Sequence, residues 1–96
     1  MLLQISYDLR DRDRDYDDLY EEIKRLGRWW HYLKSTWIIE TDKSPRQVVD
    51  DLQELLSRGD RLIVSETDRL DGVLPEKAWN WLEKHKATHN LRYSLS

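Results

Sequence analysis

In the first segment of the chain, residues 2–9, hydrophobic and polar positions alternate. Leu3, Ile5 and Tyr7 are separated by polar residues, which is typical of a β-strand with two different faces. Three later segments are also rich in residues that favour strands, namely 28–33, 36–41 and 61–66. Only Lys34 and Ser35 separate the first two of these, so we expect them to form a β-hairpin.

Two other segments carry hydrophobic residues at the spacing of an amphipathic helix. The first covers residues 16–26 and is expected to end at Gly27. Its apolar stripe consists of Tyr16, Leu19, Tyr20, Ile23 and Leu26. The second begins at Ser44-Pro45-Arg46-Gln47, where Ser44 is expected to cap the helix and Gln47 to complete a capping box. We expect this second helix to end at Gly59.

A shorter helix is predicted at residues 76–86, and the tail, residues 90–96, alternates in the manner of a late strand. The order strand, helix, hairpin, helix, strand predicts an α+β protein. It is typical of the ferredoxin-like β-α-β-β-α-β sandwich with a four-stranded antiparallel sheet. Right-handed crossovers would place the first and third strands at the centre and both longer helices on one face. The other face of the sheet would then be bare unless something else covers it.

The composition fits one domain spanning residues 1–96, with 39% hydrophobic and 36% charged residues. The absence of cysteine excludes a disulfide scaffold, a thiolate metal site and a cysteine nucleophile. No apolar run approaches the roughly 20 residues of a membrane span, and the first residues do not form a signal peptide. We therefore expect a cytoplasmic protein that does not enter a membrane. The net charge of −3 argues against strong general affinity for nucleic acid, although a local basic patch would allow binding.

Several motifs resemble one group of small proteins. The strand ends in Tyr7-Asp8, a polar loop and helix lead to Gly27, and the hairpin contains Ser35-Thr36-Trp37-Ile38. This arrangement resembles the CRISPR-associated Cas-two adaptation nucleases and their VapD-like relatives over about two-thirds of the chain. Gly-x-Trp-Trp-His-Tyr-Leu at 27–33 and Leu-Pro-x-x-Ala-Trp-x-Trp-Leu at 74–82 resemble the SinR family over nearly all of it. The resemblance implies a ferredoxin-like homodimer.

Asp8 is the principal candidate for chemistry. In the Cas-two family the matching aspartate is the proposed metal ligand, supplied by both subunits of a dimer. The resemblance therefore implies that Asp8 is both a catalytic residue and a ligand of Mg²⁺, as in a metal-dependent endonuclease. The alternative is that an aspartate ends a strand because its side chain bonds to the nearby backbone of a turn.

Arg10, Arg12 and Arg14 match the basic loop of the same family, which implies contacts with the phosphates of nucleic acid. Each arginine is followed by an aspartate, so a ladder of surface ion pairs explains the pattern equally well. Because residues 10–15 include no hydrophobic residue, we expect a mobile and solvent-exposed loop.

The hairpin carries four aromatic residues, Trp29, Trp30, Tyr32 and Trp37. Aromatic residues on an open sheet can stack on bases. The first strand offers only Leu2, Gln4 and Ser6 for such a surface, so we favour packing in the core or in a dimer. The histidines lack the spacing of a zinc site, and the glycines match no phosphate-binding loop.

These observations favour a Cas-two-like homodimer that binds or processes DNA or RNA. Two alternatives remain open, a Mg²⁺-dependent nuclease that uses Asp8 and a non-catalytic protein–protein interaction module. The dimer is expected to form through the bare face of the sheet and the tail at 90–96. In the Cas-two family a late strand pairs with the sheet of the partner, and such pairing protects an exposed sheet edge.

Overall fold

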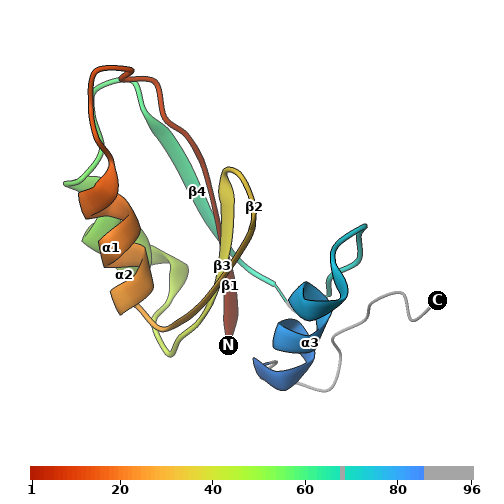
Figure 1. Ribbon diagram of the computed structural model, residues 1–96. Helices are drawn as coiled ribbons and strands as arrows, with labels where there is room; N and C mark the ends of the chain where they lie inside the picture. Colours follow the sequence, from red (N-terminus) through yellow and green to blue (C-terminus); the bar gives the residue numbers. More distant parts are fainter. Residues whose placement is uncertain (68, 86–96) are drawn as a thin grey trace.

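The computed structural model describes residues 1–67 and 69–85 (Figure 1). The described part is an α+β structure with a four-stranded antiparallel sheet and three helices. Its elements in chain order are β1 (Leu2–Asp8), α1 (Asp17–Arg25), β2 (Arg28–Leu33), β3 (Thr36–Glu40), α2 (Pro45–Gln53), β4 (Arg61–Glu66) and α3 (Glu76–His85). None of the described helices is both long enough and apolar enough to cross a membrane.

The strands lie in the order β2-β3-β1-β4, and each neighbouring pair is antiparallel. The first and third strands are therefore central, as predicted. At the middle of β1, Ile5 is paired with Trp37 of β3 on one side and with Val64 of β4 on the other. This register places Tyr7 and Asp8 at the end of an inner strand, next to the start of β4.

The main core lies between the sheet and the pair of helices α1 and α2, which share one side of the sheet (Figure 1). Leu3 and Ile5 of β1 are fully buried there, together with Leu19 and Ile23 of α1. The alternation in β1 and the helical spacing in α1 predicted that these residues are buried. The Nε1 of Trp37 donates a hydrogen bond of 3.0 Å to the hydroxyl of Tyr7, so the polar atoms at this edge of the core are paired.

A second core covers part of the opposite face, which the sequence left bare. Helix α3 packs there, on the side of the sheet away from α1 and α2 (Figure 1). Its Ala78 and Leu82 contact Trp30 of β2 and Ile38 of β3. The sequence had left open what covers this face, and at this end of the sheet the cover is α3 of the same chain. The short third helix has an apolar side, and this side is buried against the hairpin of β2 and β3.

The N-terminus of α2 confirms the predicted capping box. The backbone N–H of Gln47 donates to the side chain of Ser44 at 3.2 Å, and the N–H of Ser44 donates to the side-chain oxygen of Gln47 at 2.8 Å. The predicted end of this helix is wrong, because α2 ends at Gln53 and not near Gly59. Turns with hydrogen bonds three residues apart follow, from Leu55 to Leu52 and from Leu56 to Gln53.

The third predicted helix is confirmed over Glu76–His85. Residue 86 and the tail at 90–96 lie outside the described residues, so the late strand stays a prediction.

Candidate functional site

The loop between β1 and α1 is held by the carboxylate of Asp60, which lies just before β4. This carboxylate accepts hydrogen bonds of 2.7 Å from three donors, namely the backbone N–H of Arg10, the hydroxyl of Tyr16 and the backbone N–H of Ser57. The hydroxyl of Ser57 also donates to the carboxylate of Asp11 at 3.2 Å. The side chains of residues 10–13 are exposed, as predicted, whereas that of Arg14 is only 23% exposed. The loop is tied to the turn before β4 at several points.

The pKa values of this network reflect the same contacts. Burial by itself would raise the pKa of Asp60. The hydrogen bonds that its carboxylate accepts, together with the nearby charge of Arg14, outweigh burial and hold this pKa below its ordinary value. Desolvation raises the pKa of Tyr16, and the hydrogen bond that its hydroxyl donates to Asp60 raises it further. The loop is thus stabilised by a charged aspartate that faces a neutral tyrosine.

Asp8 lies at the exposed end of β1 and is paired with an arginine of its own loop. Its Oδ2 accepts hydrogen bonds from Nε and Nη2 of Arg10 at 3.0 and 2.8 Å, and both side chains are 58% exposed. Asp8 also lines an open hollow of about 260 Å³ with Ser6, Arg61 and Ile63. Within residues 1–67 and 69–85, no group of three or more side chains could hold a metal ion. Coordination of Mg²⁺ by Asp8 stays a prediction, because proteins often hold this ion with one or two carboxylates together with water and substrate phosphates.

The other two arginines of the loop differ from one another. Arg14 donates to the carboxylate of Asp18 at 3.0 Å and to the hydroxyl of Ser57 at 2.9 Å, and its guanidinium lies 4.8 Å from the ring centre of Tyr16. Arg12 is exposed and makes no such contact in the part of the chain that the structure describes. Acids of the same chain thus engage Arg10 and Arg14, but the partners are Asp8 and Asp18 and not the aspartates that follow the arginines. The binding of phosphates by the three arginines stays a prediction.

The four aromatic residues of the hairpin do not form one surface. Trp37 is buried in the core under α1 and α2, whereas Trp30 is buried under α3, where its Nε1 donates to the carbonyl of Ala78 at 3.1 Å. For these two the preferred assignment to the core is confirmed. Trp29 is different, because 43% of its surface is exposed at the edge of the sheet.

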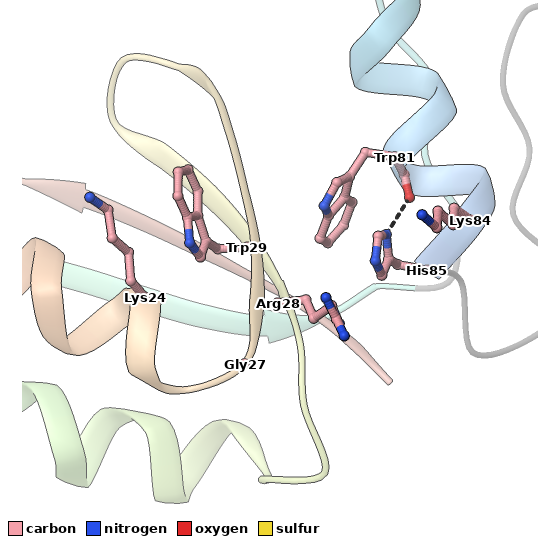
Figure 2. A pocket seen from close by; sticks show the side chains of 7 residues that line it. All are labelled: Lys24, Gly27, Arg28, Trp29, Trp81, Lys84 and His85. Atoms are coloured by element: carbon pink, nitrogen blue, oxygen red, sulfur yellow. Dashed lines mark hydrogen bonds between the residues drawn. The ribbon is translucent and has the colours of Figure 1, made fainter.

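Trp29 forms part of a hollow that the sequence did not predict. This hollow has a volume of about 440 Å³ and lies where the end of α1 and the start of β2 approach α3 (Figure 2). Its lining is basic and aromatic: Lys24, Gly27, Arg28, Trp29, Trp81, Lys84 and His85. Trp29 stands on the side of β2 that faces α1, and Trp81 stands on α3 on the other side of this strand (Figure 2). The side chain of Arg28 lies below Trp81 in the same view.

Each tryptophan has another lining residue of the hollow against its ring, Lys24 at Trp29 and His85 at Trp81. The ammonium of Lys24 lies 5.2 Å from the ring centre of Trp29 and 3.4 Å from the carboxylate of Glu21. The ring of His85 stacks on Trp81 with the ring centres 4.2 Å apart, and its Nδ1 lies 2.9 Å from the Trp81 carbonyl oxygen.

Two further cations line the hollow. Among the described residues, neither Arg28 nor Lys84 forms an ion pair, although Glu40 lies opposite Arg28 in the register of β2 and β3.

The floor of the hollow explains why Gly27 follows α1. A Cβ atom at this position would clash with the carbonyl oxygen of Glu40 at the end of β3. Only glycine therefore lets the chain leave α1 and enter β2 this close to β3. In the sequence, the available signal was that Trp81, Lys84 and His85 lie three and four residues apart and share one side of a helix. Nothing local indicated that this side faces Arg28 and Trp29.

No family model, curated protein or solved structure matches the chain. The SinR and Cas-two resemblance therefore stays a prediction, and function has to be argued from the geometry.

Proposed function

We propose that this protein binds nucleic acid as a Cas-two-like homodimer of ferredoxin-like fold, with the basic and aromatic hollow as its contact surface. The observation that carries the proposal is the meeting of Arg28 and Lys84, both without an ion pair in the described chain, beside Trp29 and Trp81. Phosphates attract such cations, and bases stack on such rings. These are the two interactions by which proteins hold nucleic acid without reading its sequence.

The charge distribution supports a local interaction. The whole chain carries a net charge of −3, so its average field repels a polyanion. The hollow concentrates Lys24, Arg28 and Lys84 within one small surface, and among the described residues Glu21 pairs with Lys24. Binding through this surface would release counterions from a small number of phosphates, which makes it weak and sensitive to salt.

The strand order and the antiparallel pairs support a ferredoxin-like arrangement. The dimer is supported by the part of the second face that α3 leaves open. There Ile63 of β4 is 67% exposed beside Ser6 and Asp8. Light scattering at micromolar concentration should give twice the chain mass of 11.7 kDa, and a monomer would contradict the dimer.

Nucleic-acid binding is tested with the full chain and fluorescently labelled oligonucleotides, by anisotropy at 50 and 200 mM salt. The variant Arg28→Gln/Lys84→Gln should weaken binding and lower the slope of log K against log salt by roughly 2. The control Arg46→Gln/Arg58→Gln removes the same charge from exposed positions outside the hollow, and it should bind like the parent. If both variants lose affinity equally, only the net charge matters and the hollow is not the contact surface.

A second candidate is the Mg²⁺-dependent nuclease, which one observation favours. Asp8 is exposed in an open hollow next to Arg61, where a phosphate has access. In this candidate a second carboxylate comes from Asp8 of the symmetric copy. Cleavage of an oligonucleotide would then require added Mg²⁺ and disappear in Asp8→Ala while the fold and the binding remain. If the parent shows no cleavage with Mg²⁺, this candidate is excluded. If no oligonucleotide binds, the protein–protein module is the remaining interpretation.

A further inference from the structure

The connection between β4 and α3 contains the pair Asp71-Gly72. Asp71 is the only aspartate of the chain that is followed by glycine, and no asparagine precedes a glycine. An aspartate side chain is able to react with the backbone nitrogen of the next residue, and a side chain on that residue hinders the reaction. Glycine has no Cβ atom and allows a wide range of backbone angles. The sequence therefore distinguishes Asp71 from every other aspartate of the chain.

The structure leaves this pair open to water and free of tight packing. Asp71, Gly72 and Val73 are all exposed, and Val73 is exposed completely. A Cβ atom built on Gly72 would have no other atom within 4 Å. Among the described residues, no backbone–backbone hydrogen bond holds residues 70–74. Backbone without such bonds changes its angles at little cost, so Asp71 is able to reach a reactive geometry.

The side chain of Asp71 already lies against the nitrogen with which it would react. The N–H of Gly72 donates to Oδ1 of Asp71 at 2.8 Å, so the carboxyl group is folded back onto the following peptide bond. Asp42 is exposed as well, but the next N–H, that of Lys43, donates to the hydroxyl of Thr41 at 3.2 Å. Asp71 thus differs from another exposed aspartate both in its neighbour and in its contact with that neighbour.

We propose that Asp71 is a site of spontaneous modification, where aspartate converts to isoaspartate through a cyclic imide formed with Gly72. In the first step, the backbone nitrogen of Gly72 bonds to Cγ of Asp71. The hydroxyl of the protonated carboxyl group leaves together with the amide proton of Gly72, as water, and a succinimide ring remains.

In the second step, a water molecule opens this ring. Cleavage of the bond between the nitrogen and Cγ restores aspartate. Cleavage of the bond between the nitrogen and the main-chain carbonyl carbon of Asp71 gives isoaspartate. No electrons are transferred to or from another molecule, and the water released in the first step is balanced by the water consumed in the second.

The modification acts on α3, because Asp71 lies between two leucines that anchor the connection. Leu70 and Leu74 are half-buried and pack against the second core, which holds α3 on the sheet. In isoaspartate the main chain runs through Cβ and Cγ, so the connection gains a backbone atom between these leucines. At least one of the two leucines then has to move relative to the core. We therefore expect isoaspartate at this position to loosen α3 from the sheet.

The test stores the full chain at neutral pH and body temperature for several weeks and compares it with a fresh sample. Peptide mapping with electron-transfer fragmentation distinguishes isoaspartate from aspartate. It should detect isoaspartate at Asp71, and severalfold less of it at the exposed control Asp42. Equal amounts at the two positions would overturn the proposed site. The proposed function is not involved, because no nucleic acid is present in this measurement.

Two variants test the ring itself. Gly72→Ala has room for its Cβ atom, and the backbone at Gly72 does not have a positive φ, so this variant should fold like the parent. It should form isoaspartate severalfold more slowly, and an unchanged rate would contradict the role of Gly72. Asp71→Asn should form the same ring faster, with ammonia as the leaving group, and each conversion changes the mass of the chain. If the mass of Asp71→Asn stays constant over the same period, the nitrogen does not reach the side chain and the proposal is wrong.

The effect on α3 is measured by hydrogen exchange on the same samples. In the stored parent, protection of α3 should fall in proportion to the isoaspartate content, while protection of α1 stays as in the fresh protein. Stored Gly72→Ala should keep the protection of its α3. If isoaspartate is present at position 71 and α3 remains as protected as before, the loosening of α3 is refuted.

Discussion

Replacing Asp60 by asparagine should destabilise the protein far more than its position in a surface turn suggests. In the parent, Oδ1 accepts from the backbone N–H of Arg10, and Oδ2 accepts from the hydroxyl of Tyr16 and the N–H of Ser57, each at 2.7 Å. Asparagine has nearly the same shape but carries one NH₂ group in place of an oxygen. Whichever way the amide turns, this NH₂ group faces a donor, so at least one hydrogen bond is lost. The remaining hydrogen bonds are made to a neutral acceptor in place of a charged one.

The magnitude follows from these contacts. Hydrogen bonds to charged groups contribute about 1.5–3 kcal/mol each, and Asp60 is half-buried, which places each of its bonds near the lower end. We therefore expect Asp60→Asn to lower the free energy of unfolding by about 2–3 kcal/mol at pH 7. Urea unfolding followed by tryptophan fluorescence measures this difference. The control is Asp13→Asn, which removes the same charge from an exposed position of the loop and should change stability by less than about 0.5 kcal/mol.

The dependence on pH gives a second test of the same carboxylate. The pKa of Asp60 is lowered in the folded state, so its stabilising effect is complete above the unfolded pKa of about 3.9. The effect is lost as the pH falls through the folded value. The stability difference between the parent and Asp60→Asn should thus be largest near neutral pH and should shrink below about pH 4. Equal stability of Asp60→Asn and Asp13→Asn, or a difference that does not change between pH 7 and pH 3, would refute the assigned role of Asp60.

Three other substitutions test the fold at separate points. Ser44→Ala removes the cap of α2 and should cost about 1 kcal/mol in urea unfolding, whereas a mutant as stable as the parent would contradict the capping box. Gly27→Ala places a Cβ against the carbonyl oxygen of Glu40 and should cost about 1–3 kcal/mol, and a neutral effect would mean that the chain relaxes there without strain. Trp30→Phe removes the indole N–H that donates to the carbonyl of Ala78 and also part of a buried ring, and it should cost about 1–3 kcal/mol. Hydrogen exchange should then show weaker protection in α3 than in α1, and unchanged protection of α3 would show that this hydrogen bond does not hold the helix.

The elements that the sequence predicted are those whose signals are local. The alternation around Ile5 predicted β1, and the same residue is fully buried in the sheet. The box at Ser44 and Gln47 predicted the start of α2, because its two hydrogen bonds join residues only three positions apart. The stripe that includes Leu19 and Ile23 predicted α1 and its buried side. In each case the residues that determine the structure lie within one or two helical turns of one another.

The loop after β1 was decided by contacts between distant residues. At the end of α2 the glycine signal was wrong, because the helix ends at Gln53 and local turns follow before Gly59. The carboxylate of Asp60 binds Tyr16, 44 positions earlier in the chain. Two aspartates in a row of charges look alike in a sequence, and only the folded chain places the backbone donors that distinguish Asp60 from the exposed Asp13.

The candidate site shows the same division. From the sequence, Asp8 and the arginines after it were identifiable through a resemblance. The hollow was not, because its two walls belong to segments more than 50 positions apart, Arg28 and Trp29 on β2 and Trp81 on α3. Packing of α3 on the sheet, with the hydrogen bond from Trp30 to Ala78, brings those walls together. The helical pattern of α3 determined that it has an apolar side, but only the tertiary structure decided which strand that side covers, because apolar contacts have no direction and many surfaces could have satisfied them.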